Sequence, residues 1–454
     1  MKIHDRTRSR ERWLLRGLLE RSTESRIIVR VTMTVTLLFY VIWMVGWPNT
    51  QLSRSSSEQN KQSGINGSTA VLDLEPSIAG KQKKTIKPLL KRNNSSLRFD
   101  WTNLPPITPL GKIIDRSQSQ CKNESFVREF GPLEVVSFNL IPSGMGSSLH
   151  TWVNPLCHAS LSNKVLVTGG KWLWNDMLTC PEEIEKSVGQ KSDATPQHRS
   201  PLWCYFGSHE SGLHCPSGTV AWDKPKVDFG AAWGSYTCEY EGAKTGWDRG
   251  PIYDAAAEWL FQNVSKLVIH EAERQIREEA FPEEEWMRGN STETAKNLDF
   301  QPWPLPNADS LITVHIRWGD KKREMELVTL EEYINGTTSL LTEDEISGVK
   351  DVHVYVVTED PNAVNQFRES SPVNWKIHSS GPKNPTSSSS MMQAATRSKG
   401  RAGLESLAAL LISLEANRYV LVSGSNWSRL INELRKSVVD SRCGQCTKMI
   451  DLSG

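Results

Sequence analysis

The fold class is set by one apolar run, Leu311-Ile-Thr-Val-His-Ile316, which continues directly into the charged sequence Arg317-Trp-Gly-Asp-Lys321. A short run without polar alternation is typical of a buried parallel strand, and ligands in open α/β sheets bind just beyond the carboxyl ends of such strands. The same pattern recurs later in the chain. Strands are expected at 352–357, 375–378 and 419–423, and helices at 329–341, 404–416 and 426–436. Strands alternating with helices predict an α/β fold whose parallel sheet is covered on both faces.

The preceding part of the chain is expected to hold a second set of such units. A strand is expected at 135–139, after which Gly144-Met-Gly146 opens a helix to Leu161, and a further strand is expected at 164–168. A glycine loop between a strand and a helix lets a phosphate or another backbone come close, so Gly144 and Gly146 are candidate binding residues, with a plain tight turn as the alternative. A long amphipathic helix is expected at 252–280, and the Ser-, Pro- and Lys-rich segment 379–400 is expected to be a loop.

The first 125 residues have a different character. Residues 1–26 carry eight basic and four acidic side chains, and the apolar segment 27–47 is interrupted only by Arg30. The length of this segment and its positive flank predict a membrane-spanning signal anchor with a cytosolic N-terminus, against the alternative of a cleaved signal peptide. Residues 48–125 are rich in Ser, Asn, Gln and Lys. They are expected to form a flexible stem with little core.

Cysteines, sequons and charge indicate the compartment and limit the partners. All eight Cys and eight N-x-Ser/Thr sequons follow the apolar segment. An even Cys count there predicts disulfides in a secretory compartment, although Cys443-Gly-Gln-Cys446 also fits a zinc or redox pair. The chain carries 53 basic and 52 acidic side chains. This balance gives no general positive field, so a nucleic acid is not expected as a partner.

The charged loop after the 311–316 strand holds the candidate catalytic residues. Arg317 is suited to a bidentate grip on a phosphate, and Lys321 adds a second positive charge. Glu324 and Glu326 are carboxylates that can accept a proton from a hydroxyl group. A solvated charged loop without function is the plainer alternative.

A second candidate site is the turn Ser423-Gly-Ser-Asn426, which precedes the last predicted helix. Free backbone N–H groups and the positive end of the helix dipole meet at such a junction, which predicts an anion site at Ser425 and Asn426. Asn426 also begins a sequon and should carry no glycan if the turn faces a ligand. At a third junction, Thr358-Glu-Asp-Pro361, Asp360 is expected to cap the following helix.

With these motifs the chain resembles the α1,6-fucosyltransferases and their relatives, which include the protein O-fucosyltransferases and the nodulation fucosyltransferases. The family motif His-x-Arg-Arg-x-Asp-Lys is similar to His315-Ile-Arg-Trp-Gly-Asp-Lys321, which Glu324 follows. The family's Thr-Asp-Asp-Pro is similar to Thr358-Glu-Asp-Pro361, and its Ser-Ser-Gln turn to Gly424-Ser-Asn426. Its glycine-rich first loop is similar to Gly144-Met-Gly-Ser-Ser-Leu-His150. The resemblance spans roughly residues 135–440, in the family's order.

The resemblance implies a GT-B-like fold with two Rossmann-like lobes, residues 126–305 on the acceptor side and 306–454 on the donor side. It implies an inverting transfer of fucose from GDP-fucose to a glycan or glycoprotein in the Golgi, with no metal and no further cofactor. By position in the motif, Arg317 binds the β-phosphate and Glu324 is the base, assisted by Lys321. The other donor-binding residues that the resemblance implies are Gly144, Gly146, His315, Asp320, Asp360, Ser425 and Asn426.

The chain departs from the family pattern at three places. Trp318 replaces the second Arg of the motif, and Ala409 stands where the family has an Asp, with Glu405 one turn away. Glu324 follows Lys321 one residue sooner than in the α1,6 enzymes, so Glu326 is a rival base. Three functions therefore stay open: a glycan fucosyltransferase, a protein O-fucosyltransferase, and a catalytically inactive lumenal scaffold or sugar-binding protein.

Overall fold

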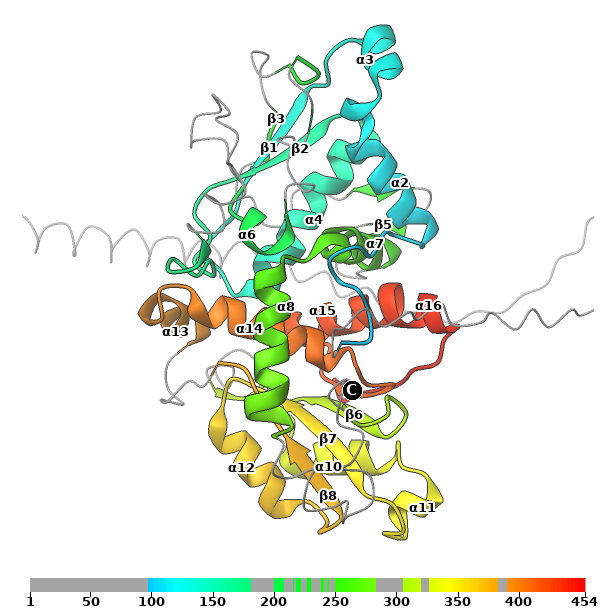
Figure 1. Ribbon diagram of the computed structural model, residues 1–454, viewed down its shortest axis with the longest axis vertical. Helices are drawn as coiled ribbons and strands as arrows, with labels where there is room; N and C mark the ends of the chain where they lie inside the picture. Colours follow the sequence, from blue (N-terminus) through cyan, green and yellow to red (C-terminus); the bar gives the residue numbers. More distant parts are fainter. Residues whose placement is uncertain are drawn as a thin grey trace, which may run out of the picture. The chain divides into compact units, whose positions relative to one another are not determined.

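The structure is a computed structural model that describes residues 97–180, 200–207, 215, 218–221, 227–229, 238–240, 243–244, 250–282, 305–319, 326–382 and 390–453. Its helices and strands are labelled in Figure 1. In chain order they are α2 (Pro109–Gln118), η1 (Gln120–Lys122), α3 (Glu124–Phe130), β1 (Val135–Asn139), α4 (Met145–Leu161), β2 (Val165–Gly169), α6 (Trp203–Phe206), β3 (Val227–Phe229), β4 (Glu239–Tyr240), β5 (Ala243–Lys244), α7 (Pro251–Leu260), η4 (Phe261–Asn263), α8 (Lys266–Gln275), η5 (Ile276–Ala280), β6 (Leu311–His315), α10 (Leu330–Thr338), α11 (Glu343–Ile346), β7 (Val352–Val357), α12 (Pro361–Ser370), β8 (Trp375–His378), α13 (Met391–Arg397), α14 (Arg401–Ser413), β9 (Arg418–Leu421), α15 (Asn426–Leu434), η7 (Arg435–Asp440), α16 (Ser441–Cys443) and β10 (Lys448–Asp451).

The predicted membrane anchor, residues 27–47, lies outside the described residues. Within the ranges that the structure describes, no helix has both the length and the apolar character needed to cross a membrane.

The described strands of the second half form a five-stranded sheet in the order β10-β9-β6-β7-β8, and all of its neighbouring strands run parallel. Its middle strand, β6, is buried at every position, and Ile312 lies opposite Val354 of β7. The four strands predicted for this half are confirmed. Their continuous apolar sequence reflects burial on both sides of the sheet.

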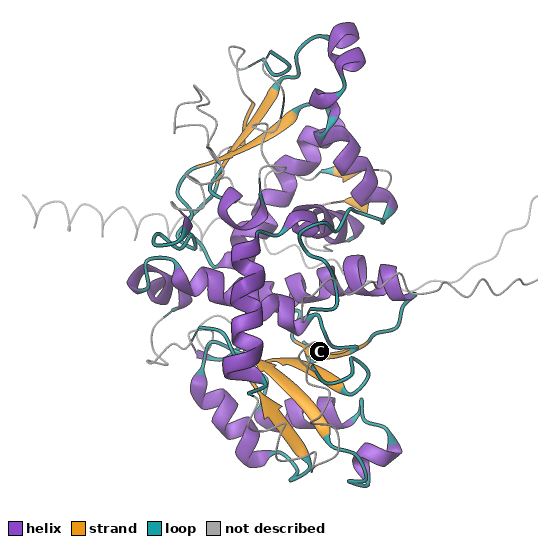
Figure 2. Cartoon of the chain, viewed as in Figure 1, coloured by secondary structure: helices purple, strands orange, loops and turns teal. Residues whose placement is uncertain are grey.

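Alternate residues of these strands belong to two different cores. Ile312 and Val354 share one core with Tyr333 of α10 and Phe367 of α12. Tyr355 of β7 belongs to the other, together with residues of α14. Helices therefore cover both faces of the parallel sheet, as the orange strands and purple helices of Figure 2 show. The predicted α/β class with a doubly covered parallel sheet is confirmed.

A second, smaller sheet lies in the first half of the chain. It has the order β2-β1-β3 among the described strands, and both pairings are parallel. Helix α4 packs against β1, and α7 packs against α4 and α2. Within this layer Trp152 stacks on Trp259 with ring centroids 5.9 Å apart. The strand–glycine loop–helix unit expected at 135–161 is therefore confirmed.

The long helix predicted at 252–280 is wrong, because the chain breaks it into α7 and α8. The break falls where backbone N–H groups bond to distant segments instead of to the helix. The N–H of Val264 donates to the carbonyl of Trp101 at 2.7 Å, and that of Ser265 donates to the carbonyl of Tyr205 at 2.8 Å. Beyond the break, α8 runs beside α14, as Figure 1 shows. Gln275 of α8 donates to the carbonyl of Glu405 at 3.1 Å, which ties the two helices together.

Two segments are more ordered than the sequence predicts. The expected loop 379–400 contains α13, whose Ser390 and Gln393 form a capping box. The fold also begins before the predicted stem boundary at residue 125. Leu97 and Trp101 are buried core residues, and the backbone N–H of Arg98 donates to the carboxylate of Glu415 at 2.8 Å. The described part of the stem region therefore packs against the folded unit.

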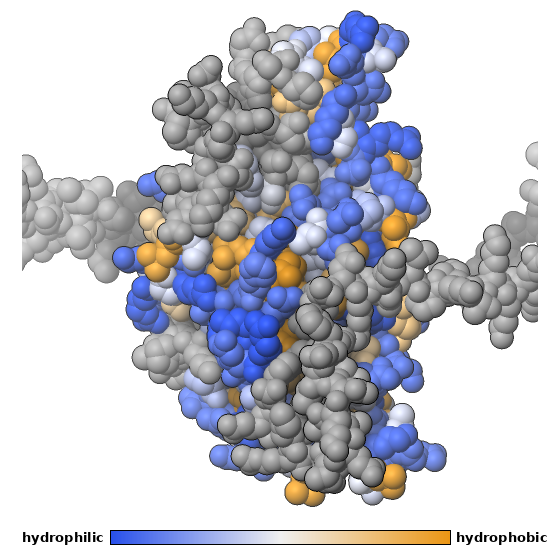
Figure 3. Space-filling view, viewed as in Figure 1, coloured by the Kyte–Doolittle hydropathy of each residue, from blue (hydrophilic) through white to orange (hydrophobic). Residues whose placement is uncertain are grey.

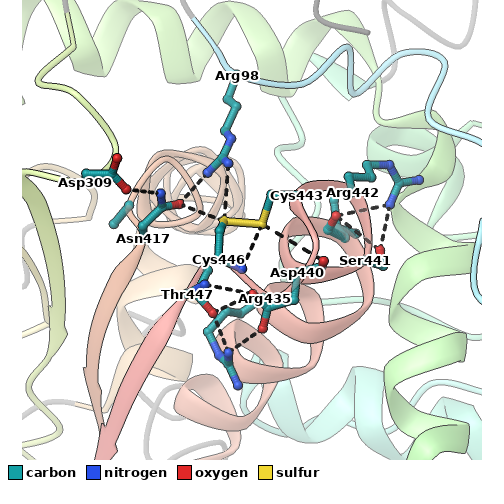
Figure 4. Close-up of a disulfide and its surroundings, with 12 residues drawn as sticks. Arg98, Asp309, Asn417, Arg435, Asp440, Ser441, Arg442, Cys443, Cys446 and Thr447 are labelled. Carbon is teal, nitrogen blue, oxygen red and sulfur yellow. Dashed lines mark hydrogen bonds and ion pairs between the residues drawn. A yellow bond between two sulfur atoms is a disulfide. The ribbon is translucent and has the colours of Figure 1, made fainter. Parts of the chain in front are cut away.

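Four disulfides link all eight cysteines, in the pairs Cys121–Cys215, Cys157–Cys238, Cys180–Cys204 and Cys443–Cys446. The prediction of disulfides is confirmed, and the zinc reading of the last pair is wrong because its sulfurs are bonded to each other. Among the described residues, Asp440 with these two Cys is the one group with the spacing of three metal ligands. The disulfide closes the turn that leads into the unpredicted strand β10, as Figure 4 shows.

Most of the described surface in Figure 3 is hydrophilic, with apolar patches between. The large apolar side chains that are more than a third exposed among the described residues are Ile107, Phe130, Leu161, Met177, Leu178, Ile346, Val349 and Val373. They lie on several different elements, and none belongs to the predicted site.

Candidate functional site

The candidate site lies at the carboxyl edge of the five-stranded sheet. The strands β6, β7 and β9 end at His315, Val357 and Leu421, and they run parallel. The predicted site segments follow these ends directly, because Arg317 comes after β6 and Ser425 comes after β9. Parallel strands bring their carboxyl ends to one edge of a sheet. The topology therefore gathers the two central motifs at one place.

His315 is a buried, neutral residue at the end of β6. Only 4% of the residue is exposed, and its Nδ1 lies 2.6 Å from Oγ of Ser428 in the first turn of α15. The same Oγ accepts the backbone N–H of Val422 at 3.1 Å. Burial, and secondarily the charge of Arg317, lowers the pKa of His315 to about 3. An uncharged ring tied to α15 can offer its second nitrogen to a ligand without adding charge.

Arg317 is held from several sides. Its backbone N–H donates to the hydroxyl of Tyr333 at 3.3 Å, and its Nη1 donates to the carbonyl of Trp318 at 3.1 Å. Nη1 also forms an ion pair with Oε1 of Glu359, the second residue after β7, and each side chain is 13% exposed. Burial of Tyr333 raises its pKa to about 12, so its hydroxyl stays protonated. The guanidinium is therefore fixed at the sheet edge, with a carboxylate of the chain beside it.

The neighbouring Asp360 has a structural task. Its Oδ1 accepts the backbone N–H of Asn362 at 2.9 Å, which makes it the N-cap of α12. The predicted cap is confirmed. The predicted contact of Asp360 with a donor stays a prediction, and its carboxylate would have to serve both purposes.

The turn between β9 and α15 differs from the expectation of free N–H groups. The N–H of Ser423 donates to Oδ1 of Asp451 at 3.0 Å, and the N–H of Gly424 donates to Oγ of Ser453 at 2.9 Å. The N–H of Ser425 donates to the carbonyl of Val422 at 2.8 Å. These three groups are therefore already bonded within the chain. An anion at this junction would use the N–H groups of the first turn of α15, which have no acceptor inside the helix.

The glycine loop meets this same helix. A Cβ on Gly146 would lie 3.0 Å from both the carbonyl carbon and the oxygen of Asn426, so a larger residue would push the two helices apart by a few tenths of an ångström. Nδ2 of Asn426 donates to Oγ of Ser147 at 2.5 Å, and its Oδ1 lies 3.2 Å from Nδ1 of His150. The first turns of α4 and α15, each with the positive end of a helix dipole, are thus side by side. The glycine loop and the last turn, predicted separately, are in contact.

A buried pair supports this contact from behind. Nε2 of His150 lies 3.0 Å from Oε2 of Glu433, and the two side chains are 5% and 6% exposed. Glu433 lies two turns after Asn426 on α15, so the same face of that helix contacts α4 twice. Sequence reasoning missed Glu433, Ser147 and the ion-pair partner Glu359. The spacing of Asn426 and Glu433 was the available signal for the first of these.

Three predicted site residues, Asp320, Lys321 and Glu324, lie outside the described residues. The rival base Glu326 is described and is exposed. Trp318 packs against the sheet core and donates its indole N–H to the carbonyl of Val328 at 2.9 Å, so it holds the far end of this loop.

The position of the missing family Asp is also apolar in the structure. Ala409 is buried, and its Cβ would lie 3.1 Å from a Cβ added to Gly381. Oε1 of Glu405 lies 3.3 Å from Nε of Arg401, and burial raises the pKa of this carboxyl. Glu405 therefore forms an ion pair with Arg401 on its own helix, α14.

Comparison with solved structures gives only weak likenesses. No family model and no curated protein matches this chain. Among solved structures, a similar one is FUT1 of Arabidopsis thaliana, determined as an Arg-to-Lys mutant in complex with GDP. It is 11% identical, covers 72% of this chain and 77% of its own, and has a TM-score of 0.34. A likeness of this size does not define a family or a site residue.

Proposed function

We propose that this chain is a GDP-fucose-dependent fucosyltransferase that attaches L-fucose to a glycan hydroxyl, with N-glycans as the first candidate acceptors and α1,6 as the first candidate linkage. The observation that carries the proposal is the contact between His150 and Asn426, which lie 276 positions apart. In the family that the motifs resemble, these two segments are the glycine loop and the phosphate-binding turn. Here they meet beside the strand that leads to Arg317. The proposal includes a GT-B-like pair of lobes, residues 126–305 and 306–454.

The proposed reaction is a single inverting displacement. The acceptor oxygen forms a bond to C1 of fucose while the bond from C1 to the β-phosphate oxygen breaks. The acceptor proton passes to the carboxylate of Glu324, with Lys321 assisting, or to that of Glu326. GDP leaves with its negative charge increased, and Arg317 with the first turn of α15 stabilises that charge most in the transition state. The proposal uses no metal.

The proposed location follows from the N-terminal segment. Residues 27–47 would anchor the chain in the Golgi membrane as a single-pass type II protein, with residues 1–26 in the cytosol. The disulfides among residues 121–446 agree with a lumenal position. Glycoproteins that pass through the same lumen would supply the acceptor.

The test uses the full chain, purified in detergent, because the structure places Leu97 and Trp101 in the core. Release of GDP from GDP-fucose is measured with a glycoprotein acceptor for the wild type and for Arg317→Ala. We expect Arg317→Ala to lower kcat/KM by about 100-fold or more, as for other removed transition-state contacts. No turnover by the wild type above this variant would refute both enzymatic readings.

The acceptor and the base are separated in the same assay. Mass spectrometry of the product distinguishes fucose on a glycan from fucose on Ser or Thr, which would indicate a protein O-fucosyltransferase. Glu324→Gln is expected to lose far more activity than Glu326→Gln, and the opposite order would move the base to Glu326.

One observation favours a second candidate function. Trp318 stands where the family has a cation, and Arg317 is already paired with Glu359. Such a site has less positive charge for a diphosphate, which suits an inactive sugar-binding or scaffold protein. In that case the chain would bind a glycan without releasing GDP, and the turnover assay separates the two.

A further inference from the structure

Two carboxylates of the chain lie at the carboxyl edge of the sheet, each beside a predicted anion-binding element. The adjacent strands β6 and β9 lead to the anion-binding candidates Arg317 and the Ser423 turn. The other neighbour of β6 is β7 and that of β9 is β10, and each of these supplies a carboxylate. Glu359 after β7 pairs with Arg317, and Asp451 of β10 bonds to Ser423. Each predicted anion-binding element is therefore in contact with a carboxylate of the chain itself.

Glu359 is the more consequential of the two carboxylates. Asp451 is exposed to water and bonds to neutral groups, whereas Glu359 is 13% exposed and opposes a full positive charge. Water screens the first interaction strongly and the second weakly. The cap of α12 does not require Glu359, because Asp360 supplies it. The role that remains for Glu359 is its ion pair with Arg317.

We infer that Glu359 is a positioning residue that holds Arg317 at the sheet edge and competes with the diphosphate for its charge. This inference rests on the proposed function, because it assigns a task within the same site. A diphosphate that approaches Arg317 meets a nearly neutral pair instead of a free cation. Glu359 thereby keeps the arginine ordered without a ligand and limits how tightly the released nucleoside diphosphate is retained.

A charge-removing substitution separates competition from a merely structural role. Glu359→Gln keeps the size of the side chain and an oxygen that can accept from Arg317, but it removes the negative charge. We expect the affinity for inorganic pyrophosphate and for GDP to rise by about tenfold, since a competing charge in contact is lost. In kinetics KM for the donor should fall, and kcat should fall with slower release of GDP. A purely structural carboxylate would give equal or weaker binding.

The experiment is calorimetric titration of the full chain with pyrophosphate and with GDP. Glu369→Gln, on the exposed end of α12, is the matched control for net charge and should leave both affinities unchanged. Adding Arg317→Ala to Glu359→Gln should abolish the gain. Unchanged or weaker binding by folded Glu359→Gln overturns the inference. If thermal melting shows that this variant is unfolded, Glu359→Asp replaces it. A gain of about two- to threefold in affinity for pyrophosphate and GDP then supports the inference, and no gain overturns it.

Failure of this inference can be distinguished from failure of the proposed function. If Glu359→Gln gains pyrophosphate affinity through Arg317 but no form turns over GDP-fucose, the inference stands and the enzyme proposal falls. If the wild type turns over GDP-fucose and Glu359→Gln shows no gain, the reverse holds.

Discussion

Asp254 is a carboxyl group whose ionisation opposes the fold. It lies in the first turn of α7, and its Oδ1 is a buried atom without a hydrogen-bond partner among the described residues. Nζ of Lys436 is 3.8 Å from Oδ2, and Glu433 lies close enough to repel its charge. Burial, only partly offset by Lys436, raises the pKa of Asp254 from 3.8 to about 7. We predict that Asp254→Asn stabilises the protein above neutral pH.

The magnitude and sign follow from the two pKa values. One pKa unit corresponds to about 1.4 kcal/mol, so the gap between 3.8 and about 7 is worth at most roughly 4 kcal/mol. The folded form binds the proton more tightly than the unfolded chain. This stability is therefore fully present below pH 3.8 and is lost as the pH rises to about 7. An amide that finds no partner offsets about 1 kcal/mol, which leaves an expected gain of about 2–3 kcal/mol for Asp254→Asn at pH 8.

The measurement is guanidinium unfolding of both forms at pH 4 and pH 8, followed by Trp fluorescence. The two forms should have nearly equal free energies of unfolding at pH 4 and should differ at pH 8. Lys436→Met is the control in the opposite direction, because it removes the attraction and should lower stability at pH 8 only. An Asp254→Asn variant no more stable than the wild type at pH 8, or equally stabilised at pH 4, would refute the reasoning.

Two further predictions concern the contact between α4 and α15. Gly146→Ala should lower the free energy of unfolding by about 1–3 kcal/mol because its Cβ would meet the backbone of Asn426, whereas Gly144→Ala, with 3.8 Å to its nearest atom, should be nearly neutral in the same urea titration. In protein from a secretory host, peptide mass spectrometry should find glycan at the exposed Asn335 and none at Asn426, whose amide nitrogen is 2.5 Å from Ser147. A glycan on Asn426 would contradict the packing described.

The strands of the larger sheet were predictable because a strand that is buried on both faces has a nearly continuous apolar sequence. The break between α7 and α8 was not, since Phe261 and Val264 keep the helical spacing of apolar residues through it. The break depends on the carbonyls of Trp101 and Tyr205, which accept N–H groups there. Local pattern carries no information about such distant acceptors. By contrast, the sequence does contain the signal for the start of α13, because Ser390 and Gln393 have the spacing of a capping box. The Ser-, Pro- and Lys-rich composition of the surrounding segment favoured a loop instead.

In the candidate site, too, some residues were predictable from the sequence and their partners were not. Arg317 and Asn426 were identifiable because each follows an apolar strand, and topology then places strand ends together. Their partners come from elements far away in the sequence, as with Glu359 for Arg317 and His150 for Asn426. A partner of this kind is fixed by the register of the sheet and by helix packing. A single sequence shows neither.

The stability of the fold and the geometry of the site are coupled through one chain of contacts. Asp254 lies beside Glu433, Glu433 bonds to His150, and His150 lies within hydrogen-bond distance of Asn426 at the start of α15. When the pH rises above about 7, ionised Asp254 places a second negative charge next to Glu433. That charge repels the carboxylate of Glu433, which bonds to His150. The pH dependence of stability and that of any activity should therefore change together in Asp254→Asn.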